Sequence, residues 1–463
     1  MPITTIRPLL IGLLLTLLCA AVFGEVCHQD FVLWDDPIHV YDNPYFRPVT
    51  WPHVWHFWRH PYENLCIPFS YSVFAALAYL ARLPVPKMMS DGMMVSFDPR
   101  VFHVASLILH FCNVLLVFGL LRRLVKNDWA AGAGALLFGL HPVQVESVAW
   151  VSELRGLLAG LFSLMALRGY VEYALARRDE AGNARIRYAA ATLCFVLALL
   201  CKPSAVTVPF VAWILDCVII RHTWRTAAKS LAGWAILSGF CLLLTHLAQP
   251  VQVGVTTAPW TRPLIAGDAL AFYLGKLVWP VGLGIDYGRT PTFVLAHWWG
   301  YATWFMPLLL GALLWYGRRR FSWLWMSAAI FAICLLPVLG LTPFAFQGYS
   351  TVADRYLYLA LLGPALALAW ALSRLTQRSA LLTGSVCAVI FALWGFASSL
   401  QVMTWDSSFS LFQNALAVNP QSGMANYNLA LLLSAQGKQA EADAHFRKAS
   451  RLKLVSANVT AQY

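Results

Sequence analysis

Two adjacent carboxylates stand in the stretch Phe31-Val-Leu-Trp-Asp35-Asp36-Pro37. Like charges this close raise the pKa of one of the two carboxyl groups, and a raised pKa suits a general base. The alternative is a solvated acidic turn that caps a helix. The pair makes Asp35 and Asp36 the candidate catalytic residues.

A second polar stretch runs from His141 to Arg155 and contains two glutamates, Glu146 and Glu153. These glutamates are two helical turns apart, so both carboxylates can face one cavity. Ionisable groups at a membrane margin are functional candidates by default. We therefore count His141, Glu146, Glu153 and Arg155 as candidate substrate-binding residues.

Two isolated cations, Lys202 and Arg355, could hold a phosphate group. Snorkelling to the membrane surface or an ordinary ion pair explains each cation equally well in isolation. Three further polar residues complete the candidate set for binding a substrate or a lipid phosphate: Asp286, Asp354 and Tyr358.

Tryptophans alternate with histidines between Trp51 and Arg59, which is typical of an interfacial amphipathic helix. The spacing of His53, His56 and His60 could also place a metal ion on one helix face. No cysteine or carboxylate nearby completes such a ligand set. We assign no metal ligand and no required cofactor, and a divalent metal stays the alternative.

The elements that must position these residues are membrane helices. The chain has 463 residues, of which 59% are hydrophobic and 12% are charged. Soluble domains carry about 25% charged residues, so the composition excludes an ordinary soluble fold. Apolar runs of about 15 to 24 residues recur along the chain, close to the length that spans a bilayer. Because the backbone there must satisfy its own hydrogen bonds, we predict an all-α polytopic fold with about 11 transmembrane helices.

The net charge of +12 comes from short basic turns between apolar runs, which is the positive-inside pattern of membrane proteins. We therefore expect a bilayer, and no nucleic acid, as the environment of the chain. Arg7 places the N-terminus in the cytoplasm, ahead of an uncleaved first span, with a cleaved signal peptide as the alternative. The basic turns contain Arg122, Arg123 and Lys126; Arg177, Arg178, Arg185 and Arg187; Arg221, Arg225 and Lys229; Arg318, Arg319 and Arg320; and Arg374 and Arg378.

Two long segments then lie outside the cytoplasm, residues 25–100 and 248–296. Each contains an apolar stretch, 66–83 and 264–281, that we interpret as re-entrant or interfacial. Counting either stretch as a span would place the later basic turns outside the cytoplasm. Cys27 and Cys66, both in the first segment, either form a disulfide or remain free thiols. Residues 1–401 make up the predicted membrane domain.

Residues 402–463 differ from the rest of the chain. Phe412 and Phe446 are 34 residues apart, and so are Ala415 and Ala449. A 34-residue period with small and aromatic positions is the signature of a tetratricopeptide repeat. Fewer than three repeats are not stable alone, so this extracytoplasmic tail should pack on the membrane domain, bind a protein partner, or do both.

Together these motifs resemble the transmembrane and tetratricopeptide-repeat O-mannosyltransferase-like proteins and their bacterial relatives, within the C-type glycosyltransferase superfamily. The resemblance covers nearly the whole chain and is carried by the order of seven stretches. They are Val32–Pro44, Pro68–Tyr79, His103–Phe118, His141–Leu158, Leu277–Tyr287, Asp354–Tyr358 and the terminal repeat.

The resemblance implies a C-type glycosyltransferase fold and an enzyme that transfers a hexosyl or pentosyl group. The donor would be a polyprenyl-phosphate-linked sugar, and the acceptor a protein hydroxyl or an envelope glycan on the periplasmic face of a bacterial inner membrane. By position, Asp35 and Asp36 match the family's first-loop acidic motif, where its base lies. Arg355 matches the arginine of the family's Arg-Tyr-Leu-Tyr motif.

The chain departs from its bacterial relatives at two places. Many of them read Glu-Arg-Lys-Asp where this chain has Glu153-Leu-Arg-Gly156, and Lys-Glu where it has Lys202-Pro203. These departures leave open a non-catalytic member of the family. Two other classes of protein therefore stay as alternatives to the enzyme. One is a non-catalytic scaffold that presents its repeat to an envelope complex, and the other is an oligosaccharide ligase or transporter.

Overall fold

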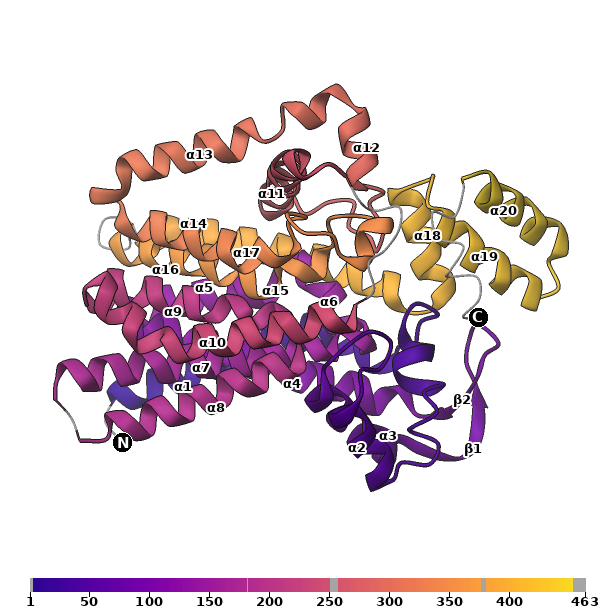
Figure 1. Cartoon of the computed structure of the whole chain (residues 1–463), viewed down its shortest axis with the longest axis horizontal. Coiled ribbons are helices and arrows are strands. Elements are labelled where there is room, and N and C mark those ends of the chain that lie inside the picture. Colours follow the sequence, from indigo (N-terminus) through magenta and orange to yellow (C-terminus); the bar gives the residue numbers. More distant parts are fainter. Residues whose placement is uncertain (1–2, 181, 250–256, 376–379, 453–463) are drawn as a thin grey trace.

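The computed structural model is an all-helical bundle with one two-stranded hairpin at one end (Figure 1). The structure describes residues 3–180, 182–249, 257–375 and 380–452. Its longest helices run side by side through the bundle. They are α1 (Ile3–Phe23), α4 (Pro99–Val125), α7 (Leu154–Arg178), α8 (Ala184–Cys201), α10 (Trp224–Ala248) and α17 (Ala380–Val402).

The shorter helices and the hairpin connect these long helices or cover their ends. They are α2 (Trp51–Arg59), α3 (Pro68–Ala81), β1 (Arg82–Met88), β2 (Met94–Phe97), α5 (Asp128–Leu140), α6 (Val145–Ala149), α9 (Val208–Leu215), α11 (Arg262–Val278), α12 (Pro291–Ala296), α13 (Phe305–Tyr316), α14 (Ser322–Leu335), α15 (Leu357–Ala360) and α16 (Leu362–Leu375). The strands pair antiparallel.

Within the described residues, seven helices are long and apolar enough to cross a membrane, or eight if α15 and α16 form one bent span. The chain is therefore a multi-pass membrane protein, but the predicted count of about 11 spans is not confirmed. The apolar run at residues 129–140, which we expect to be one of the spans, forms the 13-residue helix α5. Helix α13 has 12 residues. Both are shorter than the roughly 20 residues that a bilayer crossing needs.

The two apolar stretches interpreted as interfacial form α3 and α11. Figure 1 shows α11 almost end-on while α10, α13 and α14 run across the view, so α11 crosses the direction of the bundle. Such an orientation suits a helix that lies along a membrane surface rather than through it. The interpretation of residues 264–281 as re-entrant or interfacial stays a prediction.

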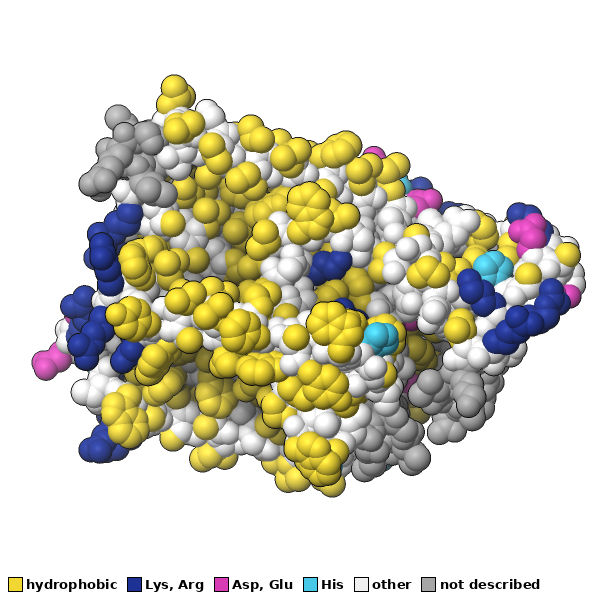
Figure 2. Space-filling view, turned by 90° about the horizontal axis from the view of Figure 1, so that it is seen from above, with side chains coloured by type: hydrophobic (Ala, Val, Ile, Leu, Met, Phe, Trp, Pro, Cys, Tyr) yellow, Lys and Arg dark blue, Asp and Glu magenta, His cyan; other side chains and the backbone are white. Residues whose placement is uncertain are grey.

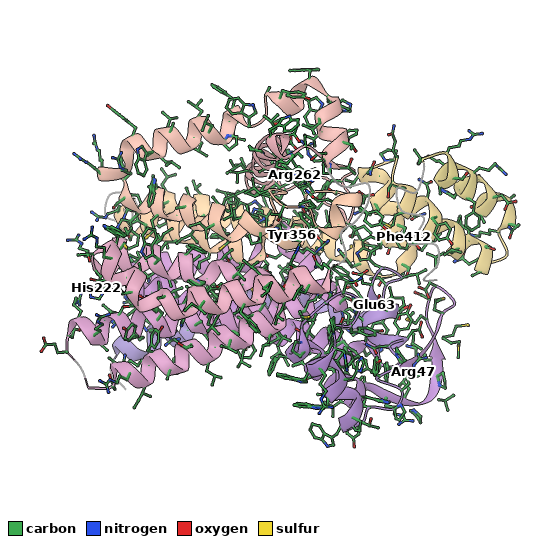
Figure 3. The ribbon with its side chains drawn as sticks, in the orientation of Figure 1. Arg47, Glu63, His222, Arg262, Tyr356 and Phe412 are labelled. Carbon is green, nitrogen blue, oxygen red and sulfur yellow. The ribbon has the colours of Figure 1, made fainter. Side chains whose placement is uncertain are left out.

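Charge divides the bundle into two ends. Figure 2 shows Lys and Arg side chains gathered at the end remote from the tail, and an apolar band over the helices between. His222 marks this basic end in Figure 3, and Phe412 marks the tail at the other. Helix α1 begins at the basic end, and the first loop with its hairpin lies near the tail. The basic turns of the described residues thus separate from the loops as predicted, whereas Arg378 lies outside those residues. Which side of a membrane each end faces stays a prediction.

The tail consists of three helices, α18 (Ser408–Val418), α19 (Gly423–Ala435) and α20 (Gln439–Arg451). Gly437, at φ 77°, makes the turn between the last two, a backbone conformation that glycine adopts without strain. The tail also packs on the membrane domain, where Asn414 donates a 2.9 Å hydrogen bond to the Leu283 carbonyl. The tetratricopeptide assignment and the domain boundary at residue 402 stay predictions.

Candidate functional site

The adjacent carboxylates of the first loop lie in different surroundings. Asp36 is 1% exposed and accepts three hydrogen bonds. Val32 N–H donates at 3.0 Å to one oxygen, and Ser152 donates to the other through its backbone N–H at 3.0 Å and its hydroxyl at 2.5 Å. Asp36 therefore ties the first loop to the turn before α7. Residue type alone does not mark Ser152 as functional, although Ser152 directly precedes the candidate Glu153.

Asp35 faces the opposite way. Its side chain is 34% exposed, and one carboxylate oxygen lies 3.8 Å from Arg155 Nη2. Desolvation raises the pKa of Asp35, and the neighbouring positive charges of Arg155 and Arg355 oppose that rise. Of the two carboxylates, Asp35 is the one that solvent reaches.

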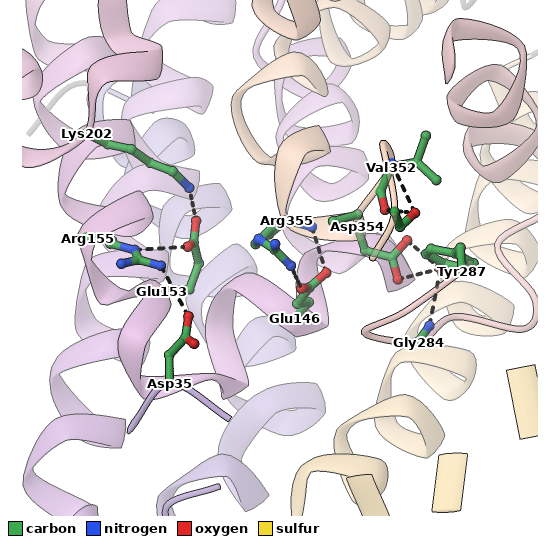
Figure 4. Close-up of polar contacts among 12 residues, drawn as sticks. Asp35, Glu146, Glu153, Arg155, Lys202, Gly284, Tyr287, Val352, Asp354 and Arg355 are labelled. Atoms are coloured by element: carbon green, nitrogen blue, oxygen red, sulfur yellow. Dashed lines mark hydrogen bonds and ion pairs between the residues drawn. The ribbon is translucent and has the colours of Figure 1, made fainter. Parts of the chain in front are cut away.

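Arg155 begins a chain of alternating charges (Figure 4). Its Nε lies 3.6 Å from Glu153 Oε2, and the Lys202 ammonium contacts Glu153 Oε1. Burial lowers the pKa of Lys202, and the Glu153 carboxylate opposes that change. Gly156 makes this arrangement possible, because a Cβ at that position would collide with the Glu153 carboxylate. The departure from the family pattern at Gly156 thus accommodates the Glu153–Lys202 pair.

Arg355 is held rigidly by a second glutamate (Figure 4). Glu146 accepts a 2.5 Å hydrogen bond from Arg355 Nη1 and a 2.9 Å hydrogen bond from the Arg355 backbone N–H. The guanidinium also lies 4.2 Å from the Phe346 ring centroid and 5.3 Å from that of Trp150, within the range of cation–π contacts. Desolvation raises the pKa of Glu146, and Arg355 opposes the rise. This support fixes the direction of a buried cation.

Both cations, Lys202 and Arg355, line one cavity between α7, α14, α15 and the turn at residues 203–207. Its volume is about 60 Å³. The remaining lining is mostly small or apolar: Gly156, Ala159, Gly160, Ala205, Cys334, Val338 and Leu359. The lining also includes the Glu153 carboxylate and several hydroxyl groups, so the cavity suits a small anionic group held between polar and apolar walls.

Two other candidates support this cavity. Tyr358 lines it, and the Tyr358 hydroxyl lies 3.0 Å from His110 Nδ1 and accepts a 2.9 Å hydrogen bond from Asn113. Asp354 accepts hydrogen bonds at 2.7 and 2.8 Å from the Tyr287 hydroxyl (Figure 4). Asp354 therefore holds the segment that carries Arg355 against the segment between α11 and α12.

The structure does not bring His141 or Asp286 to the cavity. His141 is buried, with Nε2 3.1 Å from the Leu277 carbonyl. Asp286 accepts a 2.8 Å hydrogen bond from Gly288 N–H and also bonds Ser422 of the tail. Both residues form bonds that join separate segments of the chain, and their predicted contacts with a substrate stay predictions.

The described residues contain no group of three or more His, Cys, Asp or Glu side chains that could hold a metal ion. The ring of His56 stacks on Tyr45, with 4.2 Å between the centroids, and lies 4.9 Å from His60. Cys27 and Cys66, the alternative disulfide pair, are both free thiols.

The fold and site define a polytopic membrane protein with an acid and two cations at one end of its helical bundle. Over most of its length the chain is distantly homologous to protein O-mannosyl-transferases. It is 25% identical to protein O-mannosyl-transferase TMTC4 of Homo sapiens over 503 residues, covering 96% of this chain and 66% of that protein. Protein O-mannosyl-transferase Tmtc3 of Drosophila melanogaster is 23% identical, with 95% and 55% covered.

Over a shorter region the identity is higher. Protein O-mannosyl-transferase Tmtc2 of Drosophila melanogaster is 30% identical over 207 residues, or 42% of this chain and 22% of that protein. The chain thus spans 66% or less of the length of these three relatives. No family model and no solved structure matches it.

Proposed function

We propose that this chain is a membrane glycosyltransferase that moves a sugar from a polyprenyl-phosphate carrier to a hydroxyl of a protein or an envelope glycan, on the outward face of the membrane. One observation carries the proposal. Asp35 connects through Arg155 and Glu153 to Lys202, and Lys202 shares its cavity with Arg355. A base and a phosphate-binding pair are the two parts that such a transfer needs.

In the proposed reaction, the Asp35 carboxylate takes the proton of the acceptor hydroxyl. The hydroxyl oxygen attacks the anomeric carbon of the sugar, and the bond between that carbon and the phosphate oxygen breaks with inversion. The electron pair stays on the departing lipid phosphate, which Lys202 and Arg355 neutralise. General-base catalysis of this kind supplies about 10²- to 10⁴-fold in rate.

The surroundings of Arg355 favour this role over a purely structural ion pair. Glu146 fixes the guanidinium through Nη1 and through the backbone, so the group is oriented before a ligand arrives. Such pre-orientation is what electrostatic stabilisation of a leaving group requires.

The test is a reconstituted transfer assay. Purified chain in proteoliposomes is given a radiolabelled polyprenyl-phosphate mannose and, in parallel, a mixture of other polyprenyl-phosphate sugars, with extracted envelope proteins as acceptors. Asp35→Asn should lower transfer by about 10²-fold or more. Asp42→Asn is the matched control, because its side chain is 50% exposed and pairs only with Arg47 among the ion pairs of the described residues.

A glycan that is lost when the gene is deleted, and restored by the wild type but not by Asp35→Asn, would identify the acceptor by glycopeptide mass spectrometry. Full transfer by Asp35→Asn would overturn the mechanism. If no donor gives transfer and no glycan changes on deletion, the hypothesis of a non-catalytic scaffold replaces that of an enzyme.

A further inference from the structure

The loop that carries Asp35 lies directly against the junction between the last long helix and the tail. The two segments are joined along residues 29–33 of the loop and 402–408 of the junction. Three hydrogen bonds connect them: Gln29 Nε2 to the Val402 carbonyl at 2.7 Å, Asp30 N–H to the Asp406 carbonyl at 3.3 Å, and Leu33 N–H to Ser408 Oγ at 2.8 Å.

Ser408, in the first turn of α18, is the centre of this contact. Its side chain is fully buried, and its hydroxyl accepts from Leu33 N–H and donates to Asp91 Oδ2 at 2.7 Å. Asp91 in turn accepts from Met93 N–H at 3.1 Å. A single hydroxyl thus fixes the backbone two residues before Asp35 and links it to the hairpin turn.

The same junction also reaches the cation side of the site. Trp405 stacks on Trp150, with 6.2 Å between the ring centroids and 28° between the ring planes. Trp150 is 6.5 Å from Trp34, the residue before Asp35, and its ring lies 5.3 Å from the Arg355 guanidinium. Residues 402–408 therefore touch supports of both the base and the phosphate-binding arginine.

We propose that Ser408 is a positioning residue for Asp35, and that the tail sets the geometry of the catalytic loop through it. The inference rests on the proposed function for its catalytic consequence. Without the hydroxyl, Leu33 N–H and Asp91 each lose a buried partner, and the loop before Asp35 is free to shift. A displacement of about 1 Å at a catalytic group can cost on the order of 10²-fold in rate. Because Ser408 does not line the donor cavity, we expect removal of its hydroxyl to lower kcat and to leave the donor KM unchanged.

The test pairs Ser408→Ala with Ser410→Ala. Ser410 stands in the same helical turn, where its hydroxyl bonds Ser407 only, so its loss weakens the helix cap without touching the loop. Hydrogen exchange of peptides covering residues 29–36 is measured in detergent, together with thermal unfolding. We expect faster exchange at 29–36 in Ser408→Ala and wild-type exchange there in Ser410→Ala.

Transfer kinetics complete the test. Ser408→Ala should lower kcat about tenfold or more, with the donor KM unchanged within about twofold. Unchanged exchange at 29–36, or a loss confined to KM, overturns the inference. If Ser408→Ala does not fold, Ser408→Cys keeps a side chain of similar size but offers Leu33 N–H only a weak sulfur acceptor, and is held to the same outcomes. A wild-type chain without any transfer activity would defeat the proposed function instead, and the exchange measurement does not depend on that activity.

Discussion

Ser152 donates two hydrogen bonds to one carboxylate oxygen of Asp36, although 116 residues separate them. This contact fixes the first loop on the turn that begins α7. It also leaves Asp35, the next residue back along the chain, turned toward Arg155. Two carboxylates of the same type and at adjacent positions therefore take different tasks, an anchor and a candidate base.

This division predicts opposite effects of two neighbouring substitutions. Asp36→Ala leaves buried donors of Val32 and Ser152 without an acceptor, so the free energy of unfolding should fall by about 2 to 4 kcal/mol. Asp35→Ala should leave thermal unfolding nearly unchanged and abolish most transfer. Thermal unfolding in detergent and the transfer assay, measured side by side, check both. Equal effects of the two variants on unfolding would contradict the assignment of anchor and base.

The protonation of Asp36 predicts a dependence of stability on pH. Burial raises the pKa of Asp36 from 3.8 to about 6, against the hydrogen bonds of Ser152 and Val32. Between about pH 4 and pH 6 the folded chain then binds more protons than the unfolded chain. This group therefore lowers the free energy of unfolding as pH rises through that window, by at most about 3 kcal/mol. Asp36→Asn should remove this contribution, and parallel unfolding curves for wild type and variant across the window would refute it.

The geometry of Arg355 predicts that charge alone does not suffice at this position. Arg355→Lys keeps a cation but cannot keep both the contact to Glu146 and the planar stack on Phe346. We expect kcat/KM to fall about tenfold or more, the equivalent of one charge-assisted hydrogen bond. Arg319→Lys, at an exposed position of the basic end, is the control and should change nothing. Wild-type kinetics of Arg355→Lys would argue against the phosphate contact.

The absence of a side chain at Gly160, in the wall of the cavity, predicts that a larger residue there raises the donor KM. A Cβ there would lie 2.9 Å from a Tyr358 ring carbon and 3.3 Å from the Asn113 amide nitrogen. Gly160→Val should therefore push Tyr358 or fill the cavity, and raise the donor KM. Gly239→Val, where a Cβ meets nothing within 4 Å, controls for the change in helix propensity. An unchanged donor KM would show that the donor does not use this part of the cavity.

The two charged ends of the bundle predict the orientation of the chain. Gln439→Cys places a thiol on the exposed face of α20, and Arg319→Cys places one in the basic turn. A membrane-impermeant maleimide added to intact cells, after removal of any outer envelope layer, should label the tail. It should label the turn only after the membrane is permeabilised, with each site read out by peptide mass spectrometry. The reverse pattern would place the proposed site on the cytoplasmic side.

The sequence alone indicated a helical membrane protein, because apolar length and basic turns are local properties of the chain. The same local signals placed Lys202, Glu153 and Arg355 among the candidates. They do not fix the number of spans, since an apolar run does not reveal where a helix ends. Helix α5 ends at Leu140, directly before His141 and Pro142, since proline disfavours helix in the residue before it. Twelve-residue α13 shows the same limit.

Only the tertiary structure decided which candidates meet. Asp35 and Asp36 are indistinguishable by type and spacing, and the partner that separates them, Ser152, comes from a distant turn. His141 and Asp286 are polar like the groups in the cavity, yet His141 bonds the Leu277 carbonyl and Asp286 bonds Ser422 of the tail. The physical reason is that hydrogen bonding, burial and ion pairing depend on contacts between segments far apart in the chain. Residue type and local period specify a helix and its apolar side, but not which groups from other segments pack against that helix.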